Sequence, residues 1–402
     1  MRPATILGML VLAAAAASQD APGPPQGQFR GDVLQGRQVF VGKGCVRCHA
    51  VLGSGGTAGP DLGESAKGSS FLDLLGRLWS HSPQMVEAVR DAGLEWPRLN
   101  ATEMDDLLSY LYYLNYFDKP GNFERGEQVY RGKGCVSCHS VGGLGGEVAP
   151  HLDAYGAMSS PVSIVAAMWN HGPNMSLKMH ELSVPKPEFK GTDVADLLAY
   201  IRGVTVTADV RRGEYVKPGN PQRGQQLFKE AGCGRCHVVG GRTDGLSAGT
   251  IGPDLARADL QHSVSELAGV MWNHGPIMWE QMKLLDLPVI TLNAADMADI
   301  IAYLYFINYS QESGDPVAGQ AVALDKGCSI CHQVGTAGEF EGPSFITSKA
   351  IESPTAFAAA LWNHAPAMVK KVESRILAWP EFRDHEMRDL HAFLVSLKTR
   401  KD

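Results

Sequence analysis

The motif Cys-x-x-Cys-His occurs four times in this chain and uses all eight of its cysteines. The copies are Cys45/Cys48/His49, Cys135/Cys138/His139, Cys233/Cys236/His237 and Cys328/Cys331/His332. This spacing is the signature of c-type haem attachment, in which two thiols bond to the porphyrin and the next histidine binds the iron as the proximal ligand. A single motif could equally be a zinc or redox pair. Four motifs with no cysteine left over predict four covalently bound haem c groups.

The sequence around the motifs repeats as well, at intervals of 90, 98 and 95 residues between the first cysteines. A glycine stands 9 residues before the first cysteine in every copy, and a proline follows the motif histidine by 11 residues, or by 16 in the third copy. These residues are Gly36, Gly126, Gly224 and Gly319, and Pro60, Pro150, Pro253 and Pro343. The longer third interval predicts an insertion in a surface loop around residues 240–250.

Each copy also has a helix expected before the motif and another at its end. The final segment carries apolar residues at three- and four-residue steps, which predicts an amphipathic helix. The final helix has an aromatic residue at Tyr110, Tyr200, Tyr303 or Phe393, and the first helix has one at Phe40, Tyr130 or Phe228, where the fourth copy has Ala323. We expect the two helices to pack aromatic against aromatic and to close each copy around its haem.

The connectors between copies suggest a duplication. The connectors that follow copies 1 and 3 have equal length and similar sequences at residues 111–116 and 304–309, whereas the connector between copies 2 and 3 is longer. This pattern predicts two equivalent two-haem halves, with copies 1 and 2 forming one close pair and copies 3 and 4 the other.

Each repeat resembles a class I c-type cytochrome domain in the order of its motifs. The resemblance implies an all-α fold of four tandem cytochrome c domains, each a small helical bundle around a covalent haem. The expected boundaries are 29–118, 119–203, 219–311 and 312–402, after a signal peptide at 1–18. It also implies that the carbonyl of Pro60, Pro150, Pro253 or Pro343 accepts the Nδ1 proton of the proximal histidine. Copy 2 departs at this turn with Ala149 and His151, and copy 4 with Ser344 and Phe345.

Two residue types compete to bind the other face of each iron. The resemblance favours methionine, at Met85, Met175, Met278 and Met368. The alternative is histidine, at His81, His171, His274 and His364, four residues before each methionine. A proline lies two residues after each of these histidines, and proline interrupts helical hydrogen bonding. We therefore expect one helix to end near the histidine and the methionine to lie on a new turn beyond it.

Composition and the N-terminus limit the setting. With 44 % hydrophobic and 20 % charged residues, the chain has the composition of a soluble globular protein, and its net charge of −7 argues against nucleic acid or anionic membranes as partners. Arg2 followed by an apolar run from Ile6 to Ala17 predicts a secretory signal peptide, with an uncleaved anchor as the alternative. No internal membrane span is expected, and the location is periplasmic or extracellular.

These features predict electron transfer. An iron with two protein ligands has no open position for a substrate, so such haems pass electrons and do not activate small molecules. We therefore expect an exported tetrahaem electron carrier or conduit, not an enzyme, whose partners are redox proteins. One alternative is a haem subunit of a periplasmic or membrane oxidoreductase complex. Another is a multihaem enzyme, such as a peroxidase or a sulfur-compound dehydrogenase.

Overall fold

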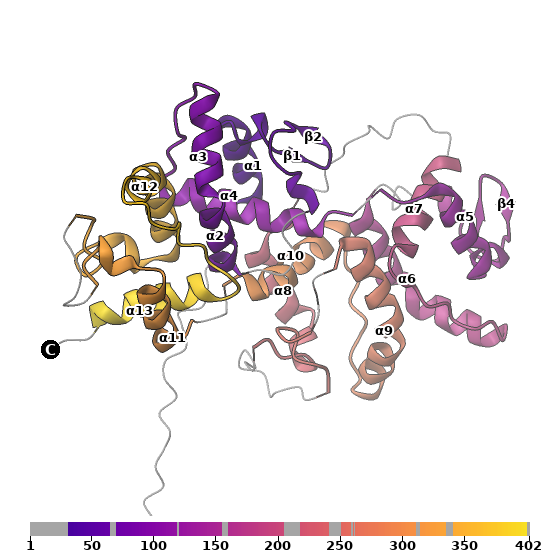
Figure 1. The fold of residues 1–402 in the computed structure, drawn as a ribbon. Coiled ribbons are helices and arrows are strands. Elements are labelled where there is room, and N and C mark those ends of the chain that lie inside the picture. Colours follow the sequence, from indigo (N-terminus) through magenta and orange to yellow (C-terminus); the bar gives the residue numbers. More distant parts are fainter. Residues whose placement is uncertain are drawn as a thin grey trace, which may run out of the picture.

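The computed structural model describes residues 31–64, 70–118, 120–154, 160–204, 218–240, 251–258, 260, 262–310, 314–334 and 341–399. The predicted signal peptide lies outside this part of the chain. Thirteen α-helices and two very short hairpins make up the regular structure of the described residues, besides one-turn 3-10 helices. The all-α prediction is confirmed, and Figure 1 shows the helices arranged in an elongated molecule.

Every copy begins in the same way. The first helices are α1 (Val33–Gly42), α5 (Phe123–Gly132), α8 (Pro221–Glu230) and α11 (Pro316–Asp325). A 3-10 helix then starts at the first cysteine of each motif: η1 (Cys45–Arg47), η4 (Cys135–Ser137), η7 (Cys233–Arg235) and η8 (Cys328–Ile330). The turn between them requires a glycine with positive φ, which is 86° at Gly44 and 68° at Gly327. This turn brings both thiols and the following histidine to one side of the copy.

The middle of each copy differs in detail. Copies 1 and 2 have a two-residue antiparallel hairpin after the motif, formed by β1 (Ala50–Val51) with β2 (Ser54–Gly55) and by β3 (Ser140–Val141) with β4 (Leu144–Gly145). The 3-10 turns η2 (Leu62–Glu64), η5 (Leu152–Ala154) and η9 (Lys349–Glu352) precede the next helix in copies 1, 2 and 4. That helix, which we call the distal helix, carries both candidate distal ligands. It is α6 (Pro161–Glu181), α9 (Val264–Leu284) or α12 (Pro354–Ser374), and in copy 1 it is split into α2 (Phe71–Ser80) and α3 (Ser82–Asp91).

The last helix of each copy crosses the first. The last helices are α4 (Ala101–Tyr113, extended by η3, Leu114–Tyr116), α7 (Asp193–Val204), α10 (Ala294–Ser310) and α13 (Glu386–Thr399). The crossing needs a glycine because a Cβ on Gly36 would overlap the carbonyl of Asp106, and the same holds in the other three copies. The expected aromatic packing is confirmed in copies 1 to 3, where ring centroids lie 5.7, 5.4 and 5.5 Å apart. In addition, Asp106 Oδ1 accepts a hydrogen bond from the backbone N–H of Asp32 at 2.7 Å, and so ties the last helix to the start of the first.

The expectation that the distal helix ends at its histidine holds only in copy 1. There, His81 separates α2 from α3. In the other copies the distal helix is 21 residues long in total and runs without a break past its histidine and through Pro173, Pro276 or Pro366. A proline inside a helix frees the carbonyl four residues earlier. Two of these carbonyls gain donors from another copy, since Lys186 Nζ lies 2.6 Å from Trp272 O and Trp96 Nε1 lies 3.0 Å from Trp362 O. Each of these hydrogen bonds replaces the helical bond that the proline removes. The donor comes from another copy, so the sequence around the proline does not reveal it.

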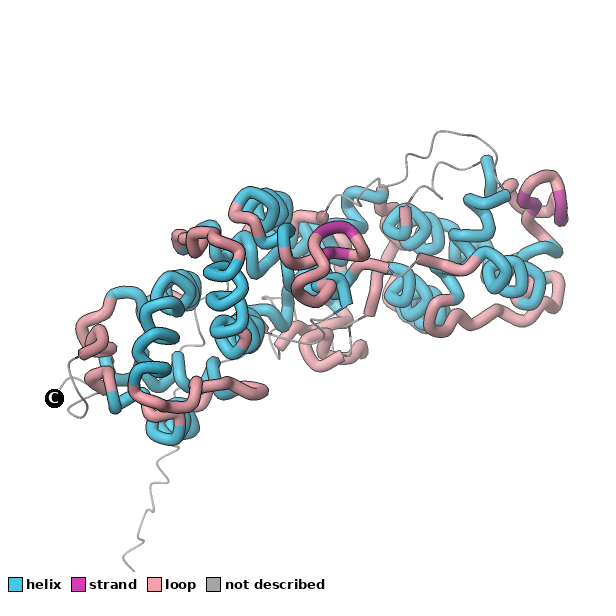
Figure 2. Tube along the Cα trace, turned by 45° about the horizontal axis from the view of Figure 1, so that its top comes forward, coloured by secondary structure: helices cyan, strands magenta, loops and turns pink. Residues whose placement is uncertain are grey.

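The copies pack in an order that differs from their order in the chain. Hydrogen bonds join the distal helix of copy 1 to copy 4 and that of copy 2 to copy 3; we call these the interlocked pairs. Figure 2 shows the resulting elongated shape, and Figure 1 shows the order, with copy 4 at one end, then copies 1 and 3, and copy 2 at the other end. The expectation of two equivalent halves agrees with this arrangement, because copies 1 and 3 occupy equivalent places, as do copies 4 and 2. The expected pairing of copies 1 with 2 and 3 with 4 is wrong.

A cluster of buried tyrosines joins copies 1 and 3 at the centre of the row. The rings of Tyr116 and Tyr305 stack with centroids 3.5 Å apart, and the equivalent pair, Tyr112 and Tyr309, has centroids 4.6 Å apart. The Tyr112 hydroxyl donates to the carbonyl of Tyr305 at 2.8 Å, and burial raises the pKa of Tyr112 to about 12. The two similar connectors thus pack on each other about a pseudo-twofold axis, which explains why their sequences match.

Candidate haem sites

The proximal side of all four sites has one geometry. Nδ1 of His49, His139, His237 and His332 lies 3.0, 2.8, 3.1 and 2.9 Å from the carbonyl oxygen of Pro60, Pro150, Pro253 and Pro343, respectively. Because a carbonyl only accepts, Nδ1 must carry the proton, which leaves the Nε2 lone pair free to bind a metal ion. Burial also lowers the pKa of His139 and of His237, and so favours the neutral ring that can act as a ligand.

The turn that holds the proximal histidine keeps its shape where the sequence departs. The N–H of Gly59 donates to Cys48 O at 2.7 Å in copy 1, and Ala149 N–H makes the equivalent bond to Cys138 O at 2.9 Å in copy 2. In copy 2, His151 bonds through Nδ1 to the Ser140 hydroxyl. In copy 4, Phe345 stacks on the ring of His332 with centroids 4.7 Å apart. The departures therefore change what surrounds the histidine without removing its bond to the proline carbonyl.

The first thiol of each motif faces the apolar interior. Burial raises the pKa of Cys45, Cys135, Cys233 and Cys328 to about 11 in each case. A thiol in such surroundings stays protonated at neutral pH. Its position suits a covalent bond to the edge of a buried apolar group.

The second cysteine of each motif is held by the backbone of the proximal turn. In copy 3, the Cys236 N–H donates to Cys233 O at 3.1 Å, and Cys236 O accepts from the Gly252 N–H at 2.8 Å. The equivalent residues in the other copies, which make the same two bonds, are Cys48, Cys138 and Cys331. All eight cysteines are half-buried. Covalent attachment of haem at these eight positions stays a prediction.

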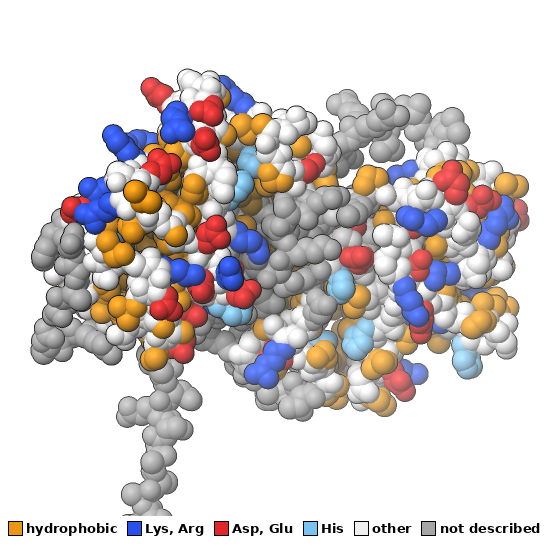
Figure 3. All heavy atoms as spheres, viewed as in Figure 1, with side chains coloured by type: hydrophobic (Ala, Val, Ile, Leu, Met, Phe, Trp, Pro, Cys, Tyr) orange, Lys and Arg blue, Asp and Glu red, His pale blue; other side chains and the backbone are white. Residues whose placement is uncertain are grey.

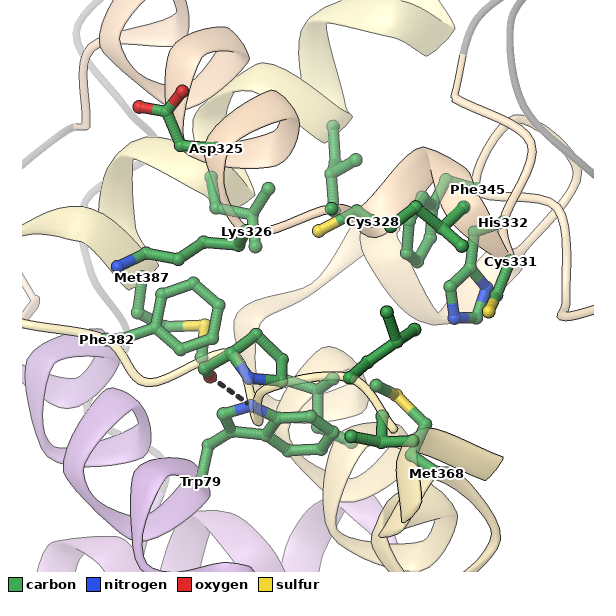
Figure 4. Close-up of a pocket in the computed structure, with 18 of the residues that line it drawn as sticks. Trp79, Asp325, Lys326, Cys328, Cys331, His332, Phe345, Met368, Phe382 and Met387 are labelled. Carbon is green, nitrogen blue, oxygen red and sulfur yellow. Dashed lines mark hydrogen bonds between the residues drawn. The ribbon is translucent and has the colours of Figure 1, made fainter. Parts of the chain in front are cut away.

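Copy 4 has a cavity between the motif and the distal helix. Cys328, Cys331 and His332 line one side, and Met368 lies opposite them (Figure 4). The remaining walls are mostly apolar: Phe345, Phe357, Leu361, Val372, Leu377, Ala378, Pro380, Phe382, Met387, Leu390 and Leu394. Two thiols and an imidazole on one wall, a thioether opposite, and apolar sides fit a porphyrin that carries iron.

The two candidate distal ligands lie one helical turn apart and face the same way. Met368 lines the cavity of copy 4, whereas His364 is not among its lining residues. The ring of His364 nevertheless lies 6.0 Å from that of His332, centroid to centroid, and the equivalent distances are 6.5 Å in copy 1 and 6.4 Å in copy 3. Two imidazoles on opposite sides of one metal ion, each bound at ~2 Å, would place their centroids about 6 Å apart. Met368 thus lies at the cavity of copy 4, and in copies 1, 3 and 4 the candidate distal histidine lies near the proximal one.

The comparisons with known proteins agree with this geometry. The Cytochrome c family model matches residues 33–115, 123–205 and 221–305. The chain belongs to the cytochrome c family. Its fourth copy follows these ranges and repeats the helices, the motif and the histidine–proline bond of the others. Cytochrome c domains carry covalently attached haem and serve in electron transfer. No curated protein and no solved structure matches the chain at a significant level.

One set of residues has a place in the structure that the sequence analysis missed. The tryptophans two positions before the candidate distal histidines all donate from Nε1 to a carbonyl of the interlocked copy. The residue after the tryptophan contributes too, since Asn363 and Ser80 bond to the backbone of the interlocked copy. The sequence could have revealed these contacts through the position of each tryptophan two residues before the histidine, because two residues correspond to about 200° of rotation around a helix. A helix that turns its histidine to its own haem must turn this tryptophan outward.

Proposed function

We propose that the chain is an exported tetrahaem cytochrome that carries electrons through four six-coordinate haems. The observation that carries the proposal is the fourfold repeat of one proximal arrangement, in which Cys-x-x-Cys-His precedes a proline carbonyl bonded to the histidine Nδ1. A bound haem supplies a one-electron Fe(III)/Fe(II) couple. The protein residues hold the ring in place, exclude water and fix the spacing between copies.

The proximal histidine sets the electronic character of each site. Its Nδ1–H bond to the proline carbonyl prevents rotation of the imidazole and increases the basicity of Nε2. The apolar walls around Cys328 and Met368 disfavour the extra charge of the oxidised state relative to water. Both effects act before and after electron transfer, so little rearrangement accompanies it.

We assign the distal position to Met85, Met175, Met278 and Met368. The position of Met368 in the copy 4 cavity, opposite His332, supports this choice. The second candidates, His81, His171, His274 and His364, have the ring spacing of 6.0–6.5 Å in their favour in three copies. Either choice fills the sixth position, and methionine gives the higher reduction potentials of the two.

Redox proteins outside the cell membrane are the proposed partners. No helix within the described ranges is both long and apolar enough to cross a membrane. On the described part of the face in Figure 3, acidic and basic side chains are interspersed. This distribution favours brief encounters with partners over a single strongly charged docking patch.

Carbon monoxide tests the proposal directly. The purified holo-protein should contain four haems by intact mass, and its fully reduced form should not change its absorption spectrum on exposure to carbon monoxide. The oxidised form should be low-spin and should accept four electrons in a reductive titration. A haem that is high-spin and binds carbon monoxide rapidly would contradict six-coordination and would favour an enzyme.

A further inference from the structure

Trp79 lies in copy 1 but forms part of the cavity of copy 4. Figure 4 shows its indole ring at the edge of that cavity, on the same side as Met368 and across from Cys328 and His332. The ring is 4 % exposed, and Nε1 donates to the carbonyl of Pro380 at 3.0 Å. It therefore both touches the cavity and holds one of the cavity's own lining residues.

Its place on the helix explains this orientation. In the unbroken distal helices the histidine follows the tryptophan by two residues and the methionine by six, as His364 and Met368 follow Trp362. These steps correspond to rotations of about 200° and about 240° around a helix, so the tryptophan lies on a different side from both candidate ligands. In copy 1, where the helix is split at His81, Trp79 lies in the last turn of α2 and keeps the same outward position. The tryptophan can reach only the neighbouring copy, where it also stacks on Trp379 with centroids 4.6 Å apart.

The same hydrogen bond, from the tryptophan Nε1 to a carbonyl of the interlocked copy, occurs in both interlocked pairs and in both directions. Trp362 of copy 4 donates to Pro97 O of copy 1 at 2.6 Å and stacks on Trp96 with centroids 4.3 Å apart. In the other pair, Trp272 donates to Pro187 O at 2.7 Å and Trp169 donates to Ile290 O at 2.9 Å. Four reciprocal hydrogen bonds at equivalent positions indicate a regular feature of the fold rather than one chance contact.

We propose that the distal-helix tryptophan of each copy completes the haem site of its interlocked partner, and that electrons pass along the row in the order 4–1–3–2. This inference rests on the proposed electron-transfer function and adds the route. Indole rings shared between copies 1 and 4, and between copies 2 and 3, make each pair a directly coupled unit. The stacked pair Tyr116 and Tyr305 joins the two units at the centre. Copies 4 and 2 are then the ends where partners deliver and remove electrons.

Two crossed substitutions test the assignment of the tryptophans. Trp79→Phe keeps an aromatic ring but removes the bond to Pro380, and Trp272→Phe removes the equivalent bond to Pro187. The readout is the paramagnetically shifted haem methyl signals of the oxidised holo-protein, assigned to individual copies. Trp79→Phe should shift the signals of the copy 4 haem most, whereas Trp272→Phe should shift those of the copy 2 haem. If each variant instead affects mainly the haem of its own copy, the proposal is wrong.

The order of the row has a second test in the unmodified protein. In a redox titration followed through the same signals, reduction of one haem should move the midpoint potential of its interlocked partner more than that of a haem in a copy with which it is not interlocked. The relevant comparisons are the interlocked pairs 1–4 and 2–3 against the pairs 1–2 and 3–4. Larger shifts between copies 1 and 2, or between copies 3 and 4, would overturn the order. Neither result depends on carbon monoxide binding, so the route can fail while the proposed function stands. A haem that binds carbon monoxide would refute the function without changing these shifts.

Discussion

Asn363→Ala should weaken the contact between copies 1 and 4. The Asn363 amide makes two bonds to one residue of the interlocked copy, because Nδ2 donates to Leu99 O at 2.7 Å and Oδ1 accepts from Leu99 N–H at 3.1 Å. Leu99 is 3 % exposed, so its backbone groups lose partners in a buried place. Each loss of this kind costs about 1–3 kcal/mol. Since water can enter the space left by the side chain, we expect about 2–4 kcal/mol in total.

Hydrogen exchange at the Leu99 amide measures this loss. If exchange proceeds through opening of the interface, about 2–4 kcal/mol corresponds to a rate increase of roughly 30- to 900-fold. Asn363→Ser is the matched control, because Ser80 occupies the equivalent position in copy 1. The Ser80 hydroxyl accepts a hydrogen bond from the Phe382 N–H at 2.8 Å and donates one to the Phe382 carbonyl. The serine variant should lose much less protection than the alanine variant.

The alternative outcome is clear. If Asn363→Ala changes the protection of Leu99 by less than about 0.5 kcal/mol, the size of an ordinary surface substitution, the interlocked pair does not hold the copies together in solution. An equal loss of protection throughout copy 4 would indicate general destabilisation of that copy. Only a loss centred on Leu99 supports the reasoning.

Two further predictions concern the ligands and the helix crossing. Met368→Ala should open the sixth position of one haem, so that the reduced protein binds about one equivalent of carbon monoxide. His364→Ala should leave the reduced protein unable to bind carbon monoxide. The reverse result would assign the sixth ligand to histidine. Asp196→Asn should lower the free energy of unfolding at neutral pH by about 1–3 kcal/mol, measured by urea denaturation, because it removes charge-assisted bonds from Arg125 at 3.0 and 3.2 Å. Burial raises the pKa of Asp196, but the hydrogen bonds from Arg125 and the Asn122 N–H outweigh burial, and the net pKa is lowered. The stability that the Asp196 carboxylate contributes is therefore present above its pKa in the unfolded chain and is lost as the pH falls through its pKa in the folded protein. Asp106→Asn should lower the free energy of unfolding less than Asp196→Asn does, because burial raises the pKa of Asp106 in the folded protein. If the loss caused by Asp196→Asn stays constant from pH 7 to acid pH, the role assigned to the Asp196 charge is wrong.

Much of each single copy follows from the sequence because its determinants are local or recur at fixed spacing. The motif fixes both thiols and the proximal histidine, and the proline eleven or sixteen residues later reaches Nδ1 in all four copies. Gly36 and Tyr110 predict the helix crossing, since a close approach needs both a glycine and a matching ring.

The arrangement of the copies could not be read in the same way. It depends on bonds between residues far apart in the chain, such as Trp79 with Pro380, and no spacing within one repeat reveals them. For the same reason, the prolines of the distal helices led to a wrong prediction of where these helices end. Pro276 looks like a helix end until Lys186 of another copy is seen to bond to the carbonyl that the proline frees.

The near-infrared charge-transfer spectrum of the oxidised holo-protein tests the central claim most directly. Methionine-bound and bis-histidine ferric haems absorb at different energies in this region, and high-spin haems differ from both. We predict that all four haems are low-spin with methionine as the sixth ligand. A spectrum with only bis-histidine bands would contradict the ligand assignment, and a high-spin fraction would contradict the claim that four six-coordinate haems carry electrons through this chain.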